Sequence, residues 1–177
     1  MKHTLLIAAF SLAGLGASLN AMAADGTITF EGVVNAKTCT LDTTTSNQTV
    51  VLPAVTTTAL TGVGTVAGAQ PFSLKATGCD AGAVAAAVFA DGNNVDPTDG
   101  NLNNTFANGT DAQIGIYRQD GTTKINLASF GDSATYTATA DASNNIVLSY
   151  VAKYIAKNAT TKAGLLKTNI QYTMSYQ

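Results

Sequence analysis

Histidine is nearly absent from this chain of 177 residues, and the single one, His3, lies in a segment that we expect to be removed. Tryptophan is missing altogether, and only 11% of the residues are charged. Without histidine, the rest of the chain lacks the usual base of nucleophilic triads and a common ligand of zinc and copper. The formal net charge of −2 comes with no cluster of Lys or Arg. Nucleic acid and anionic membranes are therefore poor partners, because both require dense positive charge.

The first 23 residues are typical of a secretory signal. Lys2 supplies the positive start, residues 5–19 are apolar, and Ala21-Met22-Ala23 is a small-x-small cleavage site. An uncut membrane anchor is the alternative, but the apolar run is short for a span and is rich in Gly, Ala and Ser. We therefore expect export, with residues 1–23 as the signal, followed by one domain.

The two cysteines, Cys39 and Cys79, both follow the predicted signal. Only one pairing exists between them, and an exported chain meets an oxidising compartment. Closing a loop of this length stabilises a fold by roughly 4 kcal/mol on the chain-entropy model. A reactive thiol pair is the alternative, but neither CxxC spacing nor a neighbouring His supports it. We predict a structural disulfide.

Short apolar runs separated by Gly, Asn, Asp and Thr predict an all-β sandwich. The run at 83–90 is apolar throughout, so a buried helical turn is the alternative there; its length and the Asp91-Gly92 stop favour a strand. Residues 91–111 read as a loop. The expected strands are residues 48–52, 71–77, 83–90, 113–119, 123–127, 134–140, 145–157 and 166–177.

The two ends of the predicted domain carry the clearest alternation. From Leu166 to Gln177 apolar and polar residues alternate strictly, which predicts a strand with one buried face. Because this strand reaches the last residue, we expect its far side to be completed by another molecule. Residues 24–34 alternate as well, and periodicity alone does not decide whether they pair within their own domain or with a neighbour. One face of that segment carries Gly26, Ile28, Phe30, Gly32 and Val34.

Several motifs follow one another in a recognisable order. An alternating arm, TITFEGVVNAKTC, runs into Cys39, and Cys79 closes a strand some forty residues later. The stretch NNTFANGTDAQIGIYRQDG leads into a strand, and Gly164 and the penultimate Tyr176 follow near the C-terminus. Together these motifs resemble those of chaperone–usher pilins, of the type 1 or P fimbrial major-subunit family.

The resemblance implies an incomplete immunoglobulin-like β-sandwich (the pilin fold) that lacks its last strand and is completed by a donor strand from a neighbouring subunit. It implies a structural subunit of an adhesive fimbria, a pilus rod that forms by donor-strand exchange and stands on the surface of a Gram-negative bacterium. The expected partners are further copies of the chain in a head-to-tail filament, a periplasmic chaperone and an outer-membrane usher. On this chain, residues 24–34 become the donor arm and residues 35–177 the pilin domain.

The resemblance also assigns roles to residues. The donor face is the set Gly26, Ile28, Phe30, Gly32 and Val34. The acceptor and chaperone-binding strand carries Gly164, Leu166, Ile170, Tyr172, Met174 and Tyr176.

Three other functions fit the sequence less well. The Asp/Asn/Gly loop at 91–104 suggests calcium, but the EF-hand pattern fails from either Asp91 or Asp99. Catalysis by paired carboxylates is disfavoured because most Asp residues stand in turn contexts such as Asp120-Gly121. The main alternative is a secreted β-sandwich binding module, either carbohydrate-binding or a minor, adaptor subunit of a fimbria. We expect no enzyme activity, no cofactor and no metal.

Overall fold

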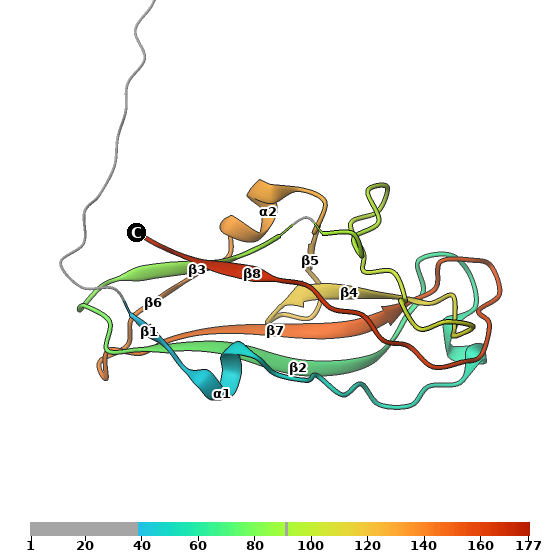
Figure 1. Cartoon of the computed structure of the whole chain (residues 1–177), viewed down its shortest axis with the longest axis horizontal. Helices are drawn as coiled ribbons and strands as arrows, with labels where there is room; N and C mark the ends of the chain where they lie inside the picture. Colours follow the sequence, from blue (N-terminus) through green and yellow to red (C-terminus); the bar gives the residue numbers. More distant parts are fainter. Residues whose placement is uncertain (1–38, 91) are drawn as a thin grey trace, which may run out of the picture. The chain divides into compact units, whose positions relative to one another are not determined.

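The computed structural model describes residues 39–90 and 92–177, so the predicted signal and arm lie outside the described residues. Strands dominate this part and form two antiparallel sheets in two layers (Figure 1). None of its helices is long and apolar enough to cross a membrane. The predicted all-β sandwich is confirmed. In chain order the elements are β1 (Thr40–Leu41), α1 (Thr43–Ser46), the 3-10 helix η1 (Thr57–Leu60), β2 (Val66–Thr77), β3 (Val84–Phe89), β4 (Gln113–Arg118), β5 (Lys124–Ile125), α2 (Phe130–Ala134), β6 (Thr137–Thr139), β7 (Ile146–Ile155) and β8 (Tyr172–Tyr176).

The larger sheet has the strand order β1-β2-β7-β4-β5. Its centre is β7, where Ile146, Leu148 and Tyr150 are buried and the residues between them are more exposed. The neighbouring β2 begins upstream of the predicted strand and contains one extra residue between Ala67 and Gln70. Gly68 fits this bulge because it has a positive φ of 66° and because a Cβ there would lie 2.8 Å from the Tyr154 ring. The bulge lets β2 continue along β7 instead of ending there.

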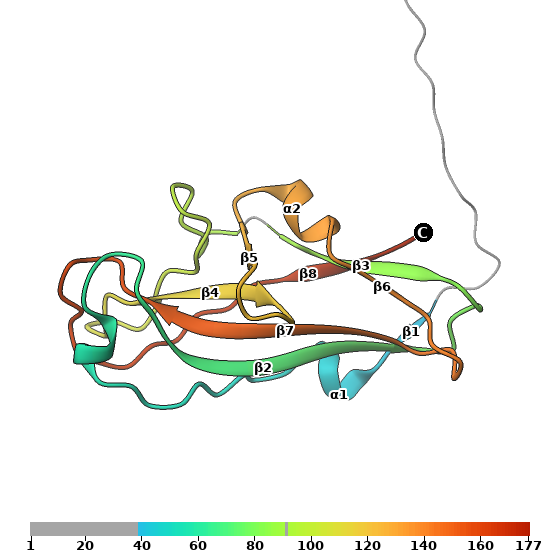
Figure 2. The ribbon, with the colours of Figure 1, turned by 180° about the vertical axis from the view of Figure 1, so that it is seen from behind.

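The smaller sheet has the order β6-β3-β8, and its central strand β3 is the predicted apolar run. Ala85, Ala87 and Phe89 of β3 pack into the same core as the inward side chains of β2, β4 and β7. Figure 2 shows the two sheets from behind. The Tyr150 ring lies at the middle of this core, with the Phe72 ring 5.3 Å and the Phe89 ring 5.5 Å from it between centroids. Burial raises the pKa of Tyr150.

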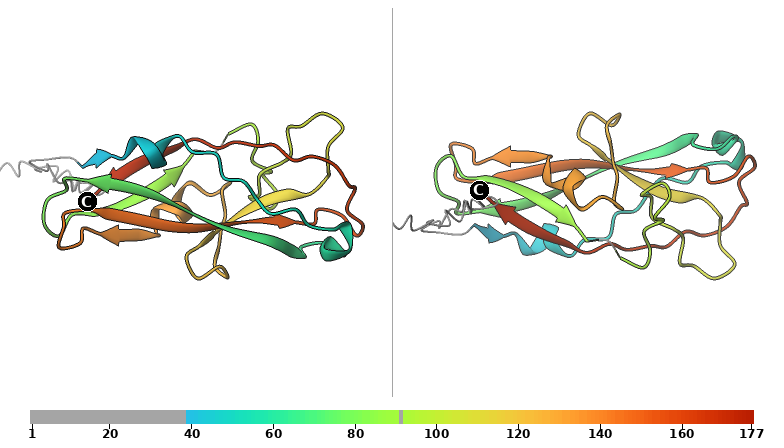
Figure 3. Two further views of the ribbon diagram at one scale, coloured as in Figure 1. Left: turned by 90° about the horizontal axis from the view of Figure 1, so that it is seen from below. Right: turned by 90° about the horizontal axis from the view of Figure 1, so that it is seen from above.

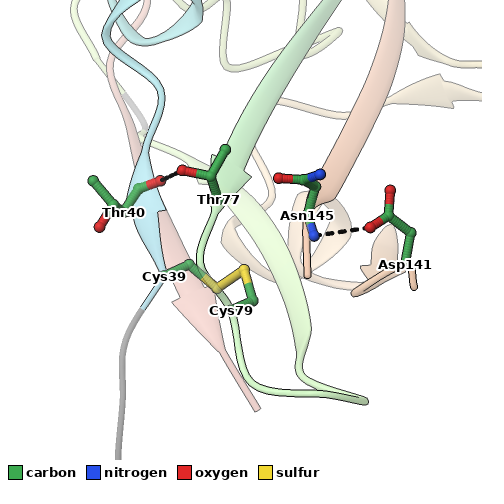
Figure 4. The surroundings of a disulfide bond; sticks show 6 residues. All are labelled: Cys39, Thr40, Thr77, Cys79, Asp141 and Asn145. Atoms are coloured by element: carbon green, nitrogen blue, oxygen red, sulfur yellow. Dashed lines mark hydrogen bonds between the residues drawn. A yellow bond between two sulfur atoms is a disulfide. The ribbon is translucent and has the colours of Figure 1, made fainter. Parts of the chain in front are cut away.

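The predicted disulfide is present and joins Cys39, just before β1, to Cys79, just after β2 (Figure 4). Thr40 pairs with Thr77 beside it, and the Thr77 hydroxyl donates to the Thr40 carbonyl oxygen at 3.4 Å. The short β1 is therefore attached to the larger sheet by a covalent bond as well as by main-chain hydrogen bonds. The point where the chain enters the described domain is fixed at this end of β2.

Three of the predicted strands differ from the structure. Residues 48–52 are not part of any strand, and only the second half of 166–177 is one, β8. Both differences have the same cause, since neither segment has a strand beside it to complete a ladder. Within 134–140, Ala134 ends helix α2 and only β6 is a strand. The Asp132 carboxylate of that helix accepts a hydrogen bond from the Asn126 main chain at 2.6 Å, which connects the helix to the preceding turn.

Candidate functional site

A groove with a volume of about 630 Å³ opens into the core between two extended segments. One segment follows α1, and the other leads into β8; Figure 3 shows both running along the same side of the sandwich. We call residues 45–52 the N-terminal wall and residues 166–172 the C-terminal wall. The floor comes from both sheets and from one loop residue: Phe72, Leu74, Phe89, Leu102, Ile114, Ile116, Ala152 and Tyr154.

The C-terminal wall has two different edges. Its even-numbered residues are partly buried, while Lys167, Asn169 and Gln171 are exposed. The main-chain groups of the odd-numbered residues bond away from the groove: the Lys167 carbonyl oxygen accepts from the Thr105 amide at 2.8 Å, and that of Gln171 accepts from the Ala90 amide at 2.9 Å. The even-numbered residues form no main-chain hydrogen bond with other described residues. They are Leu166, Thr168 and Ile170.

The open edge continues along β8. This strand pairs with β3 on one side, where Val84 and Gln177 exchange two hydrogen bonds of 3.2 and 2.8 Å. In an antiparallel ladder such bonding alternates, so the main-chain groups of Tyr172, Met174 and Tyr176 point to the other side. In the described part of the chain, β8 has no strand partner on that side. One row of free amide and carbonyl groups therefore extends from the C-terminal wall along β8.

The N-terminal wall is attached in another way. Its residues 48–52 form no main-chain to main-chain hydrogen bond within the described part of the chain. The Gln48 side chain donates to the Ser73 carbonyl oxygen at 2.8 Å, and Val50 and Leu52 pack against the core. Val51, between them, is 75% exposed. Residues 48–52 are therefore held by side chains, and their main chain is free of main-chain partners among the described residues.

Tyr172 lines the groove and contacts both of its walls. Its hydroxyl donates to the carbonyl oxygen of Ser46, the last residue of α1, at 3.2 Å and so connects the two walls. Burial is the largest cause that raises the pKa of Tyr172. A tyrosine hydroxyl is protonated at neutral pH even at its ordinary pKa, so it can act as this donor.

The sequence-predicted acceptor residues are distributed along this site. Leu166, Ile170 and Tyr172 line the groove, while Met174 and Tyr176 pack against the core farther along β8. Gly164 lies outside the groove, where a Cβ would be 2.6 Å from the Thr110 amide nitrogen and 2.7 Å from the Gly109 carbonyl carbon. The structure thus shows Gly164 at a close main-chain approach that precedes the wall. The predicted donor face, Gly26, Ile28, Phe30, Gly32 and Val34, lies outside the described residues.

Sequence reasoning did not identify the N-terminal wall as part of the site, nor Leu102 in its floor. The inward spacing of Val50 and Leu52 was a usable signal, because it places both on one face of an extended segment. No local pattern marks Leu102. It pairs with Ile114 through two main-chain bonds of 2.8 and 2.9 Å, a contact made by folding of the loop.

The Asp/Asn/Gly loop at 91–104 is held by lysine side chains. The Lys157 ammonium group lies 2.8 Å from a carboxylate oxygen of Asp96, and this hydrogen bond is the largest cause that lowers the Asp96 pKa to about 2. The buried Gln113 side chain donates to the same oxygen at 3.1 Å. On the other side of the loop, Lys124 donates to the Asp99 carbonyl oxygen at 2.7 Å and to the Asn101 side chain at 3.0 Å. Two ammonium groups thus organise these oxygen atoms.

Nothing in the site suggests a cofactor or a catalytic centre. Among residues 39–90 and 92–177, no three His, Cys, Asp or Glu side chains gather where they could hold a metal ion. The site consists of an apolar floor with free main-chain amides and carbonyls beside it. An extended segment with alternating apolar side chains matches both features, because it pairs its main chain with the edge and buries every second side chain.

Fold and groove together define a β-sandwich with an apolar groove and an unpaired strand edge along one side of the described residues. A family model, FimA, described as type-1 fimbrial protein, A, matches residues 52–177. The chain belongs to this family of type-1 fimbrial proteins.

Curated relatives agree with the family. The chain is 36% identical over 162 residues to the F17 fimbrial protein of Escherichia coli, covering 88% of this chain and 89% of that protein. It is 37% identical over 166 residues to the major fimbrial subunit SMF-1 of Stenotrophomonas maltophilia, covering 90% and 97%. This chain is accordingly a structural fimbrial subunit.

Two solved structures share the fold. The P pilus rod subunit PapA superposes with a TM-score of 0.51 at 19% identity, covering 85% of this chain and 100% of PapA. A Burkholderia pseudomallei antigen and type I fimbria protein superposes with a TM-score of 0.53 at 22% identity, covering 78% and 88%. The pilin fold that the sequence resemblance implied is confirmed.

Proposed function

We propose that this fimbrial subunit polymerises by donor-strand exchange into the rod of an adhesive fimbria. In this proposal the arm of one copy, residues 24–34, fills the groove of the next copy. The observation that carries the proposal is the row of free main-chain groups on the C-terminal wall, which lies beside an open apolar floor.

The proposed donor matches the groove in pattern. Eleven extended residues reach roughly 36 Å, and alternate side chains recur about every 6.6–7 Å along a strand. The same period separates Leu166, Thr168 and Ile170 on the wall. Ile28, Phe30 and Val34 then enter the core, and burial of each contributes roughly 1.5–3 kcal/mol. Gly26 and Gly32 mark positions where the donor main chain passes close to the subunit.

The same groove explains the need for helper proteins. An open edge beside an exposed core promotes aggregation, so it has to be covered from export until assembly. We propose that a periplasmic chaperone covers it first, along Leu166, Ile170, Tyr172, Met174 and Tyr176, and that exchange for the arm takes place at an outer-membrane usher. Head-to-tail contacts of this kind do not close on themselves, so they produce a filament on the cell surface. The role is structural, without catalysis.

The proposal is tested by Ile28→Asp with Thr29→Asp as the matched control. Both changes place one carboxylate in the arm, but Ile28 belongs to the proposed donor face and Thr29 to the opposite one. We expect Ile28→Asp to abolish filaments in electron micrographs, because an unpaired charge would enter an apolar groove. Thr29→Asp should assemble. Normal filaments from Ile28→Asp would overturn the donor assignment.

A further inference from the structure

Asn104 lies where the loop that follows β3 meets the start of the C-terminal wall. Its side chain forms four hydrogen bonds, which use all of its donors and acceptors. The amide nitrogen donates to the carbonyl oxygens of Thr110 at 2.8 Å and of Leu165 at 2.9 Å. The amide oxygen accepts from the main-chain amides of Phe106 and Lys167, both at 2.9 Å.

This arrangement imitates a neighbouring strand. In an antiparallel sheet, the carbonyl of one residue and the amide of the residue two positions later point to the same side and bond to the adjacent strand. Leu165 and Lys167 are such a pair, and the Asn104 carboxamide takes the place of the adjacent main chain. Thr105 continues the contact, since its amide and hydroxyl both donate to the Lys167 carbonyl oxygen at 2.8 Å. The outer edge of the wall is thereby occupied.

Satisfying the outer edge has a consequence for the groove. A free segment can rotate, bond to itself or close over the apolar floor, and each such state competes with an incoming strand. With Leu165 and Lys167 held at Asn104 and Thr105, the start of the wall keeps Leu166 and Thr168 turned to the groove. The apparent affinity of a ligand falls in proportion to the fraction of molecules that are ready to bind it.

We infer that Asn104 is a positioning residue for strand acceptance, holding the C-terminal wall in the register that an incoming donor arm requires. This inference rests on the proposed function of the groove. Asn104 acts on the donor arm indirectly, by holding the C-terminal wall. Its replacement should therefore change the affinity of the subunit for the arm as well as the stability of the subunit.

The test compares Asn104→Asp with Asn108→Asp in the full-length chain, freshly purified as a monomer. Both variants replace a carboxamide by a carboxylate in the same loop, but an Asp at 104 cannot donate to Thr110 and Leu165, whereas Asn108 is exposed. The probe is a fluorescent peptide of residues 24–36, followed by anisotropy. We expect Asn104→Asp to weaken peptide binding by about tenfold or more and Asn108→Asp by less than about twofold.

Unfolding midpoints separate positioning from simple stabilisation. Asn104→Ala, which deletes the bonds without adding charge, serves as the second variant in case Asn104→Asp does not fold. If a folded Asn104 variant loses stability but binds the peptide as tightly as the wild type, the positioning role is wrong and the proposed function stands. If the wild type itself does not bind the peptide, the proposed function fails. The inference is supported if folded Asn104 variants bind the peptide more weakly while the wild type and Asn108→Asp bind it tightly.

Discussion

The two walls of the groove are built by opposite means. The C-terminal wall has its outer edge bonded to the 90–110 loop through main-chain and side-chain hydrogen bonds. The N-terminal wall has no main-chain bonds along residues 48–52 and is held by Val50, Leu52 and the Gln48 side chain. In the proposed exchange, the C-terminal wall is therefore fixed in register before the donor arm binds, whereas no main-chain hydrogen bond within the described part of the chain holds residues 48–52.

This difference assigns separate tasks to the two sides. Main-chain hydrogen bonds set the register of an added strand, so the wall that presents them in fixed positions selects how the donor lies. The opposite wall completes the cover over the apolar side chains, and side-chain packing tolerates small shifts of the main chain. Changes to the C-terminal wall should thus disturb recognition and folding most, and changes to the N-terminal wall should have moderate and local effects.

The largest expected loss of stability comes from crowding the segment that leads into the C-terminal wall. Gly164→Ala places a Cβ 2.6–2.7 Å from main-chain atoms of Gly109 and Thr110, which cannot rotate away as a side chain would. We expect the free energy of unfolding to fall by about 2–3 kcal/mol in urea titrations of the monomer, because the wall must move. Gly131→Ala is the control, since nothing lies within 4 Å of a Cβ there. Helix α2 should gain about 0.5–1 kcal/mol from that change. Equal losses in both variants would contradict the close approach at Gly164.

A moderate loss of stability is expected from a change in the N-terminal wall. Leu52→Ala removes a partly buried side chain that packs on the core, and should lower the free energy of unfolding by about 1–2 kcal/mol. Val51→Ala, at the neighbouring and 75% exposed position, should change it by less than about 0.5 kcal/mol. If both variants lost the same amount, the wall would be held by something other than its inward side chains.

The sequence predicted the C-terminal wall of the groove but not the N-terminal wall. Alternation over 166–177 predicts which side chains of the C-terminal wall face inward, and the burial of even-numbered residues agrees. Alternation reports side-chain faces and gives no information about main-chain partners, so the pattern did not show that β8 begins only at Tyr172. The central strands β3 and β7 were predicted well because both are long apolar or alternating runs with partners on two sides.

The N-terminal wall and the 90–110 loop could not be predicted for a different reason. Residues 48–52 read as a strand because their composition suits one, yet strand formation requires a neighbour that the described domain does not supply there. The role of Asn104 depends on contacts with residues about sixty positions later, and Asn-rich loops look alike in sequence. Whether residues 24–34 pair with their own domain or with a neighbour is likewise undetermined by periodicity.

The smallest change in stability is expected from protonation of Asp96, in the loop that contacts the C-terminal wall. Asp96 has a folded-state pKa of about 2, below its ordinary value of 3.8, mainly because it accepts a hydrogen bond from Lys157. A lowered carboxylate pKa means that the stabilisation is complete above pH 3.8 and is lost as the pH falls from 3.8 through about 2. We therefore expect Asp96→Asn to be less stable than the wild type at neutral pH, with the difference between their unfolding midpoints shrinking over that interval.

A pair of lysine variants tests the cause of the lowered pKa. Lys157→Met should move the folded-state pKa of Asp96, measured by NMR, back toward 3.8. Lys162→Met, which removes a lysine that does not contact Asp96, should leave it unchanged. A constant difference between wild type and Asp96→Asn from pH 7 to about 2 would show that the carboxylate acts through its shape alone, and the loop would then support the wall without its ion pair.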